Sequence, residues 1–216
     1  DTNYALDYRE MAPKEATEDM FIVNGEVDRK LALESYLSSG VPGTVKGLYI
    51  AHQKFGLLPW KRLVSPAIKL ARDGFIVTET LAKSLESNKE KLAKTSDGRE
   101  IFFNNGSILK SGDLLVQTDL AQTLELIAQN GPAGFYEGHT AQKIHSDMRK
   151  NGGLISSADL SNYKAKFRTP IEFNYKDLTI LTMPPPSSGG LILGLMLNMI
   201  EQLELDYSDP HQADNI

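Results

Sequence analysis

The chain contains no cysteine and only one tryptophan among its 216 residues. The absence of cysteine excludes disulfides, thiolate nucleophiles, zinc knuckles and iron–sulfur clusters formed within this sequence. Catalytic chemistry must therefore use oxygen or nitrogen side chains, or come from a part of the protein outside this sequence.

Basic residues are fewer than acidic ones. Lys and Arg number 23 against 28 Asp and Glu, which gives a formal net charge of −5 at pH 7. This balance argues against nucleic acid or another polyphosphate as the main partner. Hydrophobic residues make up 41% of the sequence. That is enough for a sizeable core, so we expect a globular chain.

Long apolar runs are missing. The longest run, residues 191–197, is far shorter than the roughly 20 residues of a membrane-spanning helix, so we predict no membrane span. The sequence begins at Asp1, with neither Met nor a basic and then apolar leader, so we expect this start to be a cut end.

Apolar periodicity and turn residues predict an α+β chain rich in helix. Alternation from Tyr4 to Tyr8 predicts a strand that presents Arg9. Helices are predicted for a short segment ending at Gly40 and for residues 44–54, 59–73, 78–94, 118–130, 135–150, 157–163 and 191–203. Thr44 and Thr118 are the predicted caps of their helices, and a restart or kink is predicted at Pro66. The helix over 78–94 is predicted to be solvated, and the one over 191–203 to be buried.

Turn signals separate the other segments. Residues 14–34 are predicted as a loop, 168–175 and 178–183 as two strands, and 101–103 as part of a small hairpin between turns at Asp97–Gly98 and Asn105–Gly106. Residues 184–190, rich in proline and then in serine and glycine, are predicted as a loop. No repeat or linker is visible, which favours a single domain over residues 1–216.

Common catalytic and ligand-binding motifs are not found. The four histidines are His52, His139, His145 and His211, and the closest two are six positions apart. On a helix that spacing puts them about 240° apart, so we predict no metal site and no cofactor. The glycines around residue 43 match no phosphate-binding motif, and Ser187 and Ser188 lie in no G-x-S-x-G elbow. Solvated helix ends explain carboxylate pairs such as Glu15 and Glu18.

Six blocks of sequence nevertheless resemble the γ-glutamyltranspeptidase family, in the family's order. They are LDYREMAP at residues 6–13, SGVPGTVKG at 39–47, PAIKLARDGF at 66–75, residues 120–138 ending in GFYEG, GGLI at 152–155 and MPPPSSGG at 183–190. Agreement in six ordered blocks is more specific than any single motif.

The resemblance implies a fold and an activity. It implies that residues 1–216 are an incomplete large subunit, the helix-rich part of the αββα sandwich of an N-terminal-nucleophile hydrolase. In that family a precursor cleaves itself and frees a Thr nucleophile on a small subunit, in a Thr-Thr-His-type motif that this chain lacks. The implied reaction is γ-glutamyl transfer from, or hydrolysis of, glutathione and related compounds. The implied location is periplasmic or secreted.

The chain alone is then expected to be inactive, with no catalytic residue of its own. Its implied partners are the small catalytic subunit from the same precursor and a γ-glutamyl small molecule. Separation from the rest of the sandwich is expected to leave apolar surface uncovered on its strands and on the helix over residues 191–203.

By resemblance, Arg9 is the one substrate-binding residue in this chain, and it clamps the α-carboxylate of the γ-glutamyl group. A planar guanidinium suits this role because it can make two parallel hydrogen bonds to a carboxylate. The alternative is that Arg9 only pairs with Asp7 or Glu10. For residues 184–190, structural support and a position bordering the site both stay open.

Two rival functions stay open as well. One is a related acylase on the same fold, acting on β-lactam side chains or poly-γ-glutamate. The other is a non-catalytic structural or interaction remnant. Arg9 favours the transpeptidase, because an arginine is expected where a free α-carboxylate must be held.

Overall fold

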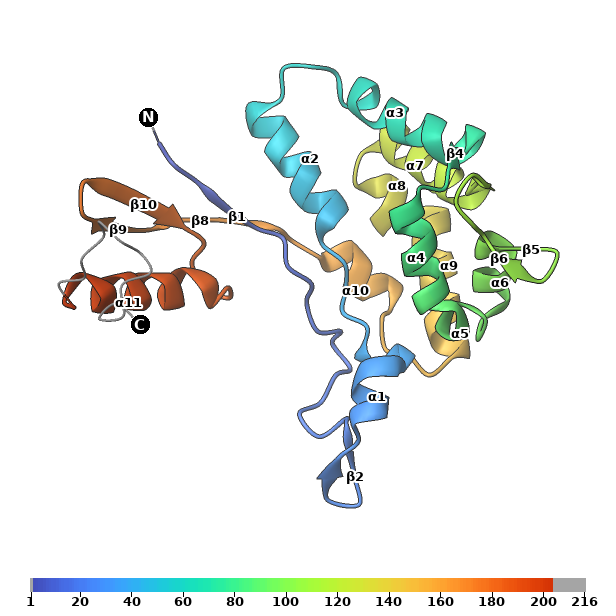
Figure 1. Cartoon of the computed structure of the whole chain (residues 1–216), viewed down its shortest axis with the longest axis horizontal. Coiled ribbons are helices and arrows are strands. Elements are labelled where there is room, and N and C mark those ends of the chain that lie inside the picture. The colour runs from blue at the N-terminus through green and yellow to red at the C-terminus, as the bar shows by residue number, and fades with distance from the viewer. Residues whose placement is uncertain (1, 204–216) are drawn as a thin grey trace. The chain divides into compact units, whose positions relative to one another are not determined.

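The computed structural model describes residues 2–203 (Figure 1). The chain forms two compact units, one made of Asp1–Arg9 with Lys164–Ile216 and the other of Glu10–Tyr163. Helix predominates, and the strands are short and paired two by two. The prediction of a helix-rich α+β chain is therefore confirmed.

The Glu10–Tyr163 unit holds most of the helices. They are α1 (Arg29–Glu34), η1 (Tyr36–Ser38), α2 (Thr44–Phe55), α3 (Trp60–Asp73), α4 (Glu79–Ser87), α5 (Lys89–Leu92), α6 (Ser96–Phe102), α7 (Thr118–Asn130), α8 (Ala133–Tyr136), α9 (Gly138–Lys150) and α10 (Ser157–Asn162). Three antiparallel pairs complete it: β2 (Ile22–Val23) with β3 (Glu26–Val27), β4 (Phe75–Ile76) with β7 (Leu114–Leu115), and β5 (Phe103–Asn104) with β6 (Ser107–Ile108).

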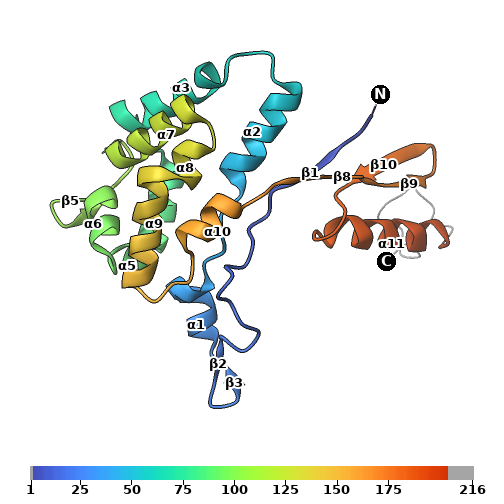
Figure 2. The ribbon, with the colours of Figure 1, turned by 180° about the vertical axis from the view of Figure 1, so that it is seen from behind.

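Helices α3 and α7 lie side by side, as both views show (Figures 1 and 2). The Trp60 Nε1–H group at the start of α3 donates to the carbonyl oxygen of Ile127 in α7, at 2.9 Å. A second hydrophobic cluster joins α4 to the short ladders and contains Val77, Leu85, Ile108, Leu109 and Leu115. Helix α7 buries Ala121, Ile127 and Ala128, whereas α3 buries Ala71 and leaves Leu63 and Leu70 about half exposed.

Tyr136 connects α8 to the first turn of α2 and to the segment before it. Its hydroxyl donates to the Pro42 carbonyl at 2.8 Å and accepts from the Lys46 N–H at 3.2 Å. Burial raises the pKa of this phenol, although the Lys46 hydrogen bond opposes the shift. The two blocks around Gly43 and Tyr136 are therefore in direct contact.

Some helix starts and interruptions differ from the prediction. The N-caps of α2 and α7 are Gly43 and Gln117, so Thr44 and Thr118 are the first helical residues and not the caps. Pro66 lies inside α3, which continues through it. A proline removes one backbone hydrogen bond, and the packing of α3 on α7 compensates for that loss.

The predicted helix over residues 78–94 is two helices, α4 and α5, which meet at Asn88. Exposed ion pairs join Lys83 to Glu79 and Lys89 to Glu86, as expected for a solvated face. The opposite face is not solvated, because Leu85 is buried. Similarly, the predicted helix over 135–150 is divided into α8 and α9.

Two hairpins also differ from the prediction. Asp97 and Gly98 lie in helix α6 and form no turn, because the Thr95 side chain caps that helix by accepting the Gly98 N–H. The small hairpin is β5–β6, around Asn105 and Gly106 only. A second hairpin, β2–β3, occupies part of the loop predicted over residues 14–34.

The described residues of the other unit form four strands and one helix. Strand β1 (Ala5–Asp7) pairs with β8 (Lys166–Arg168), and β9 (Ile171–Tyr175) pairs with β10 (Leu178–Thr182), both antiparallel. The strand predicted over residues 168–175 is thus two strands. Helix α11 (Gly189–Glu201) packs on β9, where Gly194 lies close to the Phe173 ring.

Helix α11 is not buried in this chain, so the prediction of a buried helix is wrong here. Leu195 and Met199 are 64% and 68% exposed, because only the face that carries Gly194 meets the hairpin. The expectation of uncovered apolar surface on this helix is confirmed. Among the residues that the structure describes, no helix is long and apolar enough to cross a bilayer.

Candidate functional site

Arg9 lies two residues beyond the end of strand β1. In the antiparallel β1–β8 pair, Ala5 is opposite Arg168 and Asp7 is opposite Lys166. Alternate residues of a strand share one face, so Asp7 and Arg168 are diagonal neighbours on the face that also carries Ala5. A long side chain can span this diagonal.

The Asp7 carboxylate divides its two oxygens between Arg168 and Arg9. Oδ2 accepts from Arg168 Nε at 2.8 Å and from Arg168 Nη2 at 2.7 Å. Oδ1 accepts the backbone N–H of Arg9 at 3.2 Å, a local bond that shapes the chain where it leaves the strand. The Asp7 side chain is 12% exposed.

The pKa of Asp7 reflects these contacts. Burial would raise it, but the hydrogen bonds from Arg168 and from the Arg9 N–H, together with the positive charge of Arg168, outweigh burial and hold it below its ordinary value. Asp7 is therefore ionised at neutral pH.

The Arg9 side chain is exposed, and its Nη1 donates to the Pro186 carbonyl at the long distance of 3.5 Å. The predicted substrate-binding residue and the predicted loop over residues 184–190 are thus in contact. Asp7 is one of the two acidic neighbours considered from sequence as partners of Arg9. Its carboxylate accepts the Arg9 backbone N–H and pairs with the guanidinium of Arg168.

The loop also has a structural part. Gly190, near the start of α11, lies where an added Cβ would collide with the Met183 carbonyl and the Thr182 side chain. Only glycine allows the helix start to approach the end of β10 this closely. The loop therefore anchors α11 and contacts Arg9.

Arg168 is the site residue that sequence reasoning missed. Its partner is 161 positions away, and only strand pairing brings the two together. The one available signal was an arginine at the start of a predicted strand, which by itself names no partner.

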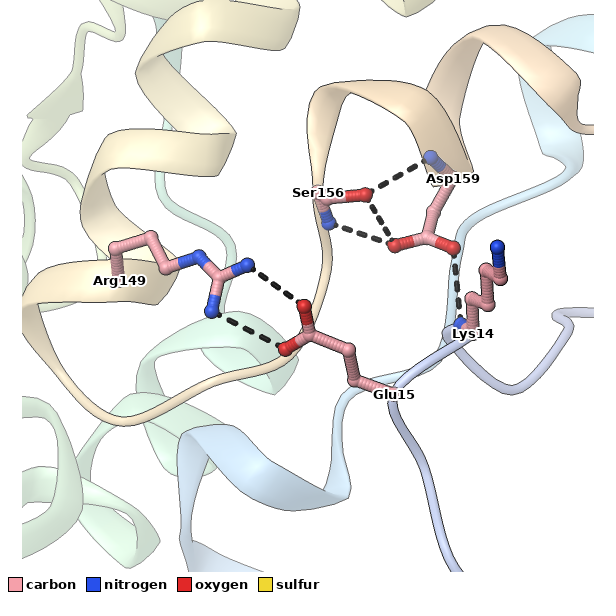
Figure 3. Close-up of polar contacts among 5 residues, drawn as sticks. All are labelled: Lys14, Glu15, Arg149, Ser156 and Asp159. Atoms are coloured by element: carbon pink, nitrogen blue, oxygen red, sulfur yellow. Dashed lines mark hydrogen bonds and ion pairs between the residues drawn. The ribbon is translucent and has the colours of Figure 1, made fainter.

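A second polar cluster lies in the Glu10–Tyr163 unit (Figure 3). Arg149 binds Glu15 through two hydrogen bonds, and Ser156 and Asp159 form a capping box at the start of α10. The other carboxylate oxygen of Asp159, Oδ1, accepts the Lys14 N–H at 2.9 Å. This cluster fixes the segment after Pro13 to α9 and α10, and Glu15 pairs with Arg149 as part of it.

The histidines occupy separate places. His52 Nε2 lies 2.7 Å from the Leu58 carbonyl oxygen, His139 and His145 lie on α9, and His211 is outside the described residues. Within residues 2–203, no three His, Asp or Glu side chains are arranged to hold a metal ion.

Comparisons with known proteins give the family. The sequence profile of the γ-glutamyltranspeptidase family matches residues 1–216. The glutathione hydrolase proenzyme of Escherichia coli K12 is 48% identical over 203 residues, which are 93% of this chain and 35% of that protein. The Pseudomonas aeruginosa protein of the same name is 41% identical over 94% of this chain and 36% of its own length. The chain thus spans about a third of these curated relatives.

Solved structures agree. The γ-glutamyltranspeptidase of Helicobacter pylori superposes with a TM-score of 0.95 at 41% identity, over 99% of this chain and 62% of that chain. The transpeptidase CapD of Bacillus anthracis superposes with a TM-score of 0.76 at 34% identity, over 98% of this chain and 65% of that chain. The expected fold, the helix-rich part of an N-terminal-nucleophile hydrolase sandwich, is confirmed by these neighbours. Because the family profile extends over the whole sequence and a solved member superposes with a TM-score of 0.95, this chain belongs to the γ-glutamyltranspeptidase family.

Proposed function

We propose that this chain is part of the large subunit of a two-subunit enzyme that transfers γ-glutamyl groups from glutathione and related compounds, or hydrolyses them. Relatives at 48% and 41% identity are glutathione hydrolase proenzymes, and a proenzyme is a precursor that is cut before it acts. Since this chain spans 35% of the first of them, the proposed activity is that of the whole protein.

The proposed reaction has two steps. A Thr hydroxyl at the start of the small subunit attacks the γ-carbonyl carbon, with its own amine as the base, and the amine side of the donor leaves as a γ-glutamyl ester forms. Water or the amine of an acceptor then attacks the ester and frees the Thr. We expect this chain alone to release no product, because the nucleophile lies outside it.

Arg9 supplies the proposed contact to substrate. The observation that carries this role is the exposed side chain of Arg9, two residues beyond a short strand, with its backbone N–H held by Asp7. Two charge-assisted hydrogen bonds to the α-carboxylate would fix both the position and the angle of the γ-glutamyl group. The γ-carbonyl would then be presented to the nucleophile in one orientation.

Arg9→Ala in the full-length protein tests this proposal. We expect kcat/KM for γ-glutamyl p-nitroanilide to fall by about two to four powers of ten, since two charge-assisted hydrogen bonds are lost. The control donor is 4-aminobutanoyl p-nitroanilide, which keeps the amine and the carbonyl but lacks the α-carboxylate. It should react poorly with the native protein and lose almost nothing further. Equal losses for the two donors would show that Arg9 only supports the fold.

A related acylase is the second candidate, because the cephalosporin acylase of Bacillus halodurans superposes with a TM-score of 0.82 at 25% identity. Release of a cephalosporin side chain, without any turnover of γ-glutamyl donors, would favour it. A full-length protein that cleaves neither kind of donor would favour the non-catalytic remnant. The periplasmic or secreted location is proposed from the family resemblance, and cell fractionation tests it.

A further inference from the structure

The strand that carries Arg9 is very short. Strand β1 has three residues, and its last ladder position is Asp7, opposite Lys166. Arg9 therefore lies beyond the strand ladder, where fixing the backbone costs conformational entropy that strand pairing does not offset. The direction of its side chain depends on contacts other than strand pairing.

Asp7 and Arg168 supply such contacts. The Nε and Nη2 groups of Arg168 both donate to Oδ2 of Asp7, and Oδ1 of Asp7 accepts the Arg9 N–H. One carboxylate thus connects strand β8 to the first turn after β1. The Arg9 backbone is held through Asp7, and Asp7 is held through Arg168.

Arg168 also controls the charge beside Arg9. An unpaired Asp7 would repel an incoming carboxylate and would attract the guanidinium of Arg9, two residues away. The bonds from Arg168 to Oδ2 offset the charge of Asp7, while Oδ1 accepts the Arg9 backbone N–H. Asp7, Arg9 and Arg168 together carry one net positive charge, which suits an anionic ligand group.

We infer that Asp7 and Arg168 are positioning residues, which hold Arg9 in the orientation that binds the α-carboxylate of a γ-glutamyl donor. The inference rests on the proposed function. Neither residue contacts substrate or the reacting atoms, so their effect passes entirely through Arg9. Their loss should harm donors that carry an α-carboxylate and spare donors that lack one.

The test uses the full-length protein with Asp7→Ala, Arg168→Ala and Arg168→Lys. For the two alanine variants we expect kcat/KM for γ-glutamyl p-nitroanilide to fall about 10- to 100-fold, mainly through KM, as is typical of coupled contacts. Turnover of 4-aminobutanoyl p-nitroanilide should change less than about threefold. Arg168→Lys should recover part of the loss, because lysine keeps the charge but not the paired donors.

Lys166→Ala is the matched control. Lys166 lies on strand β8, as Arg168 does, directly opposite Asp7 on β1. Its charge lowers the pKa of Asp7 less than the charge of Arg168 does. Its removal takes away a cation without touching the Arg168 bond. We expect kcat/KM for the γ-glutamyl donor to change less than about threefold.

A double-mutant cycle with Arg9→Ala separates positioning from general support. In the Arg9→Ala background, adding Arg168→Ala should cost less than about threefold more, because no guanidinium remains to be oriented. Additive losses, or equal losses for both donors, would overturn the inference. The unfolding temperature and the extent of precursor cleavage report folding. If Arg168→Ala fails to fold, Arg168→Lys and Asp7→Asn carry the same comparison.

The outcomes also separate this inference from the proposed function. If Arg9→Ala does not distinguish the two donors, the proposed function itself fails. If Arg9→Ala distinguishes them and the Asp7 and Arg168 variants do not, the positioning inference alone is wrong.

Discussion

The carboxylate of Glu15 and the guanidinium of Arg149 face each other through two parallel hydrogen bonds of 3.0 and 3.1 Å (Figure 3). The two residues are 134 positions apart, and both side chains are about half exposed. The arginine lowers the pKa of Glu15 through the hydrogen bond and its charge. Because exposed ion pairs add little stability, this pair mainly fixes where the segment after Pro13 lies on α9.

The capping box next to it should matter more for stability. We expect Ser156→Ala to lower the free energy of unfolding by about 1 kcal/mol, because the Asp159 N–H loses its acceptor and α10 loses its cap. Urea denaturation measures the change. Glu15→Gln is the comparison, with a smaller effect that shrinks further at high salt. A larger loss from Glu15→Gln would contradict this ranking.

Acid should weaken the same region. Burial would raise the pKa of Asp159, but its hydrogen bonds to Ser156 and Lys14 hold it below the ordinary value of 3.8. A carboxyl group whose pKa is lower in the folded state than in the unfolded state stabilises the fold at pH values above the unfolded-state pKa. This stabilisation is lost as the pH falls through the folded-state pKa.

We therefore expect the free energy of unfolding to fall from about pH 5 downward, and Asp159→Asn to flatten this part of the profile. Chemical denaturation at a series of pH values measures both. An unchanged slope in Asp159→Asn would show that other carboxyl groups carry the acid dependence.

Gly134 should not tolerate a side chain. An added Cβ would collide with the backbone of Leu126 and Ile127, where α8 turns back against α7. We expect Gly134→Ala to cost about 1–3 kcal/mol of stability, measured by thermal or urea unfolding. Gly189→Ala is the control, because its Cβ would meet only the Ser187 hydroxyl at 3.6 Å. A neutral Gly134→Ala would mean that α7 and α8 separate easily.

The exposed side of α11 should make the isolated chain self-associate. Leu191, Leu195 and Met199 are each at least half exposed, and neighbouring apolar side chains of this kind favour association. We expect light scattering to show a mass above that of one chain, and Leu195→Glu with Met199→Glu to reduce it. A native chain that stays monomeric and binds no hydrophobic dye would contradict this expectation.

Local patterns predicted most helices, because the signals involved lie within one or two turns. Residues 44–54 and 118–130 carry apolar periodicity ended by Gly56 and Gly131, and α2 and α7 follow them closely. Two details were missed. The interruption at Asn88 lies between Leu85 and Leu92, which both pack in the hydrophobic cluster. The helix through Asp97 and Gly98 follows a local signal, the Thr95 cap.

The sequence by itself determined the family, the helix-rich composition of the fold and the position of Arg9 after a strand. All three depend on residue order along continuous segments, which folding does not alter. Only the tertiary structure decided that Arg168 pairs with Asp7, that Pro186 accepts from Arg9 and that Arg149 binds Glu15. Each of these contacts joins residues more than a hundred positions apart, and such a contact exists only after strands and helices have packed.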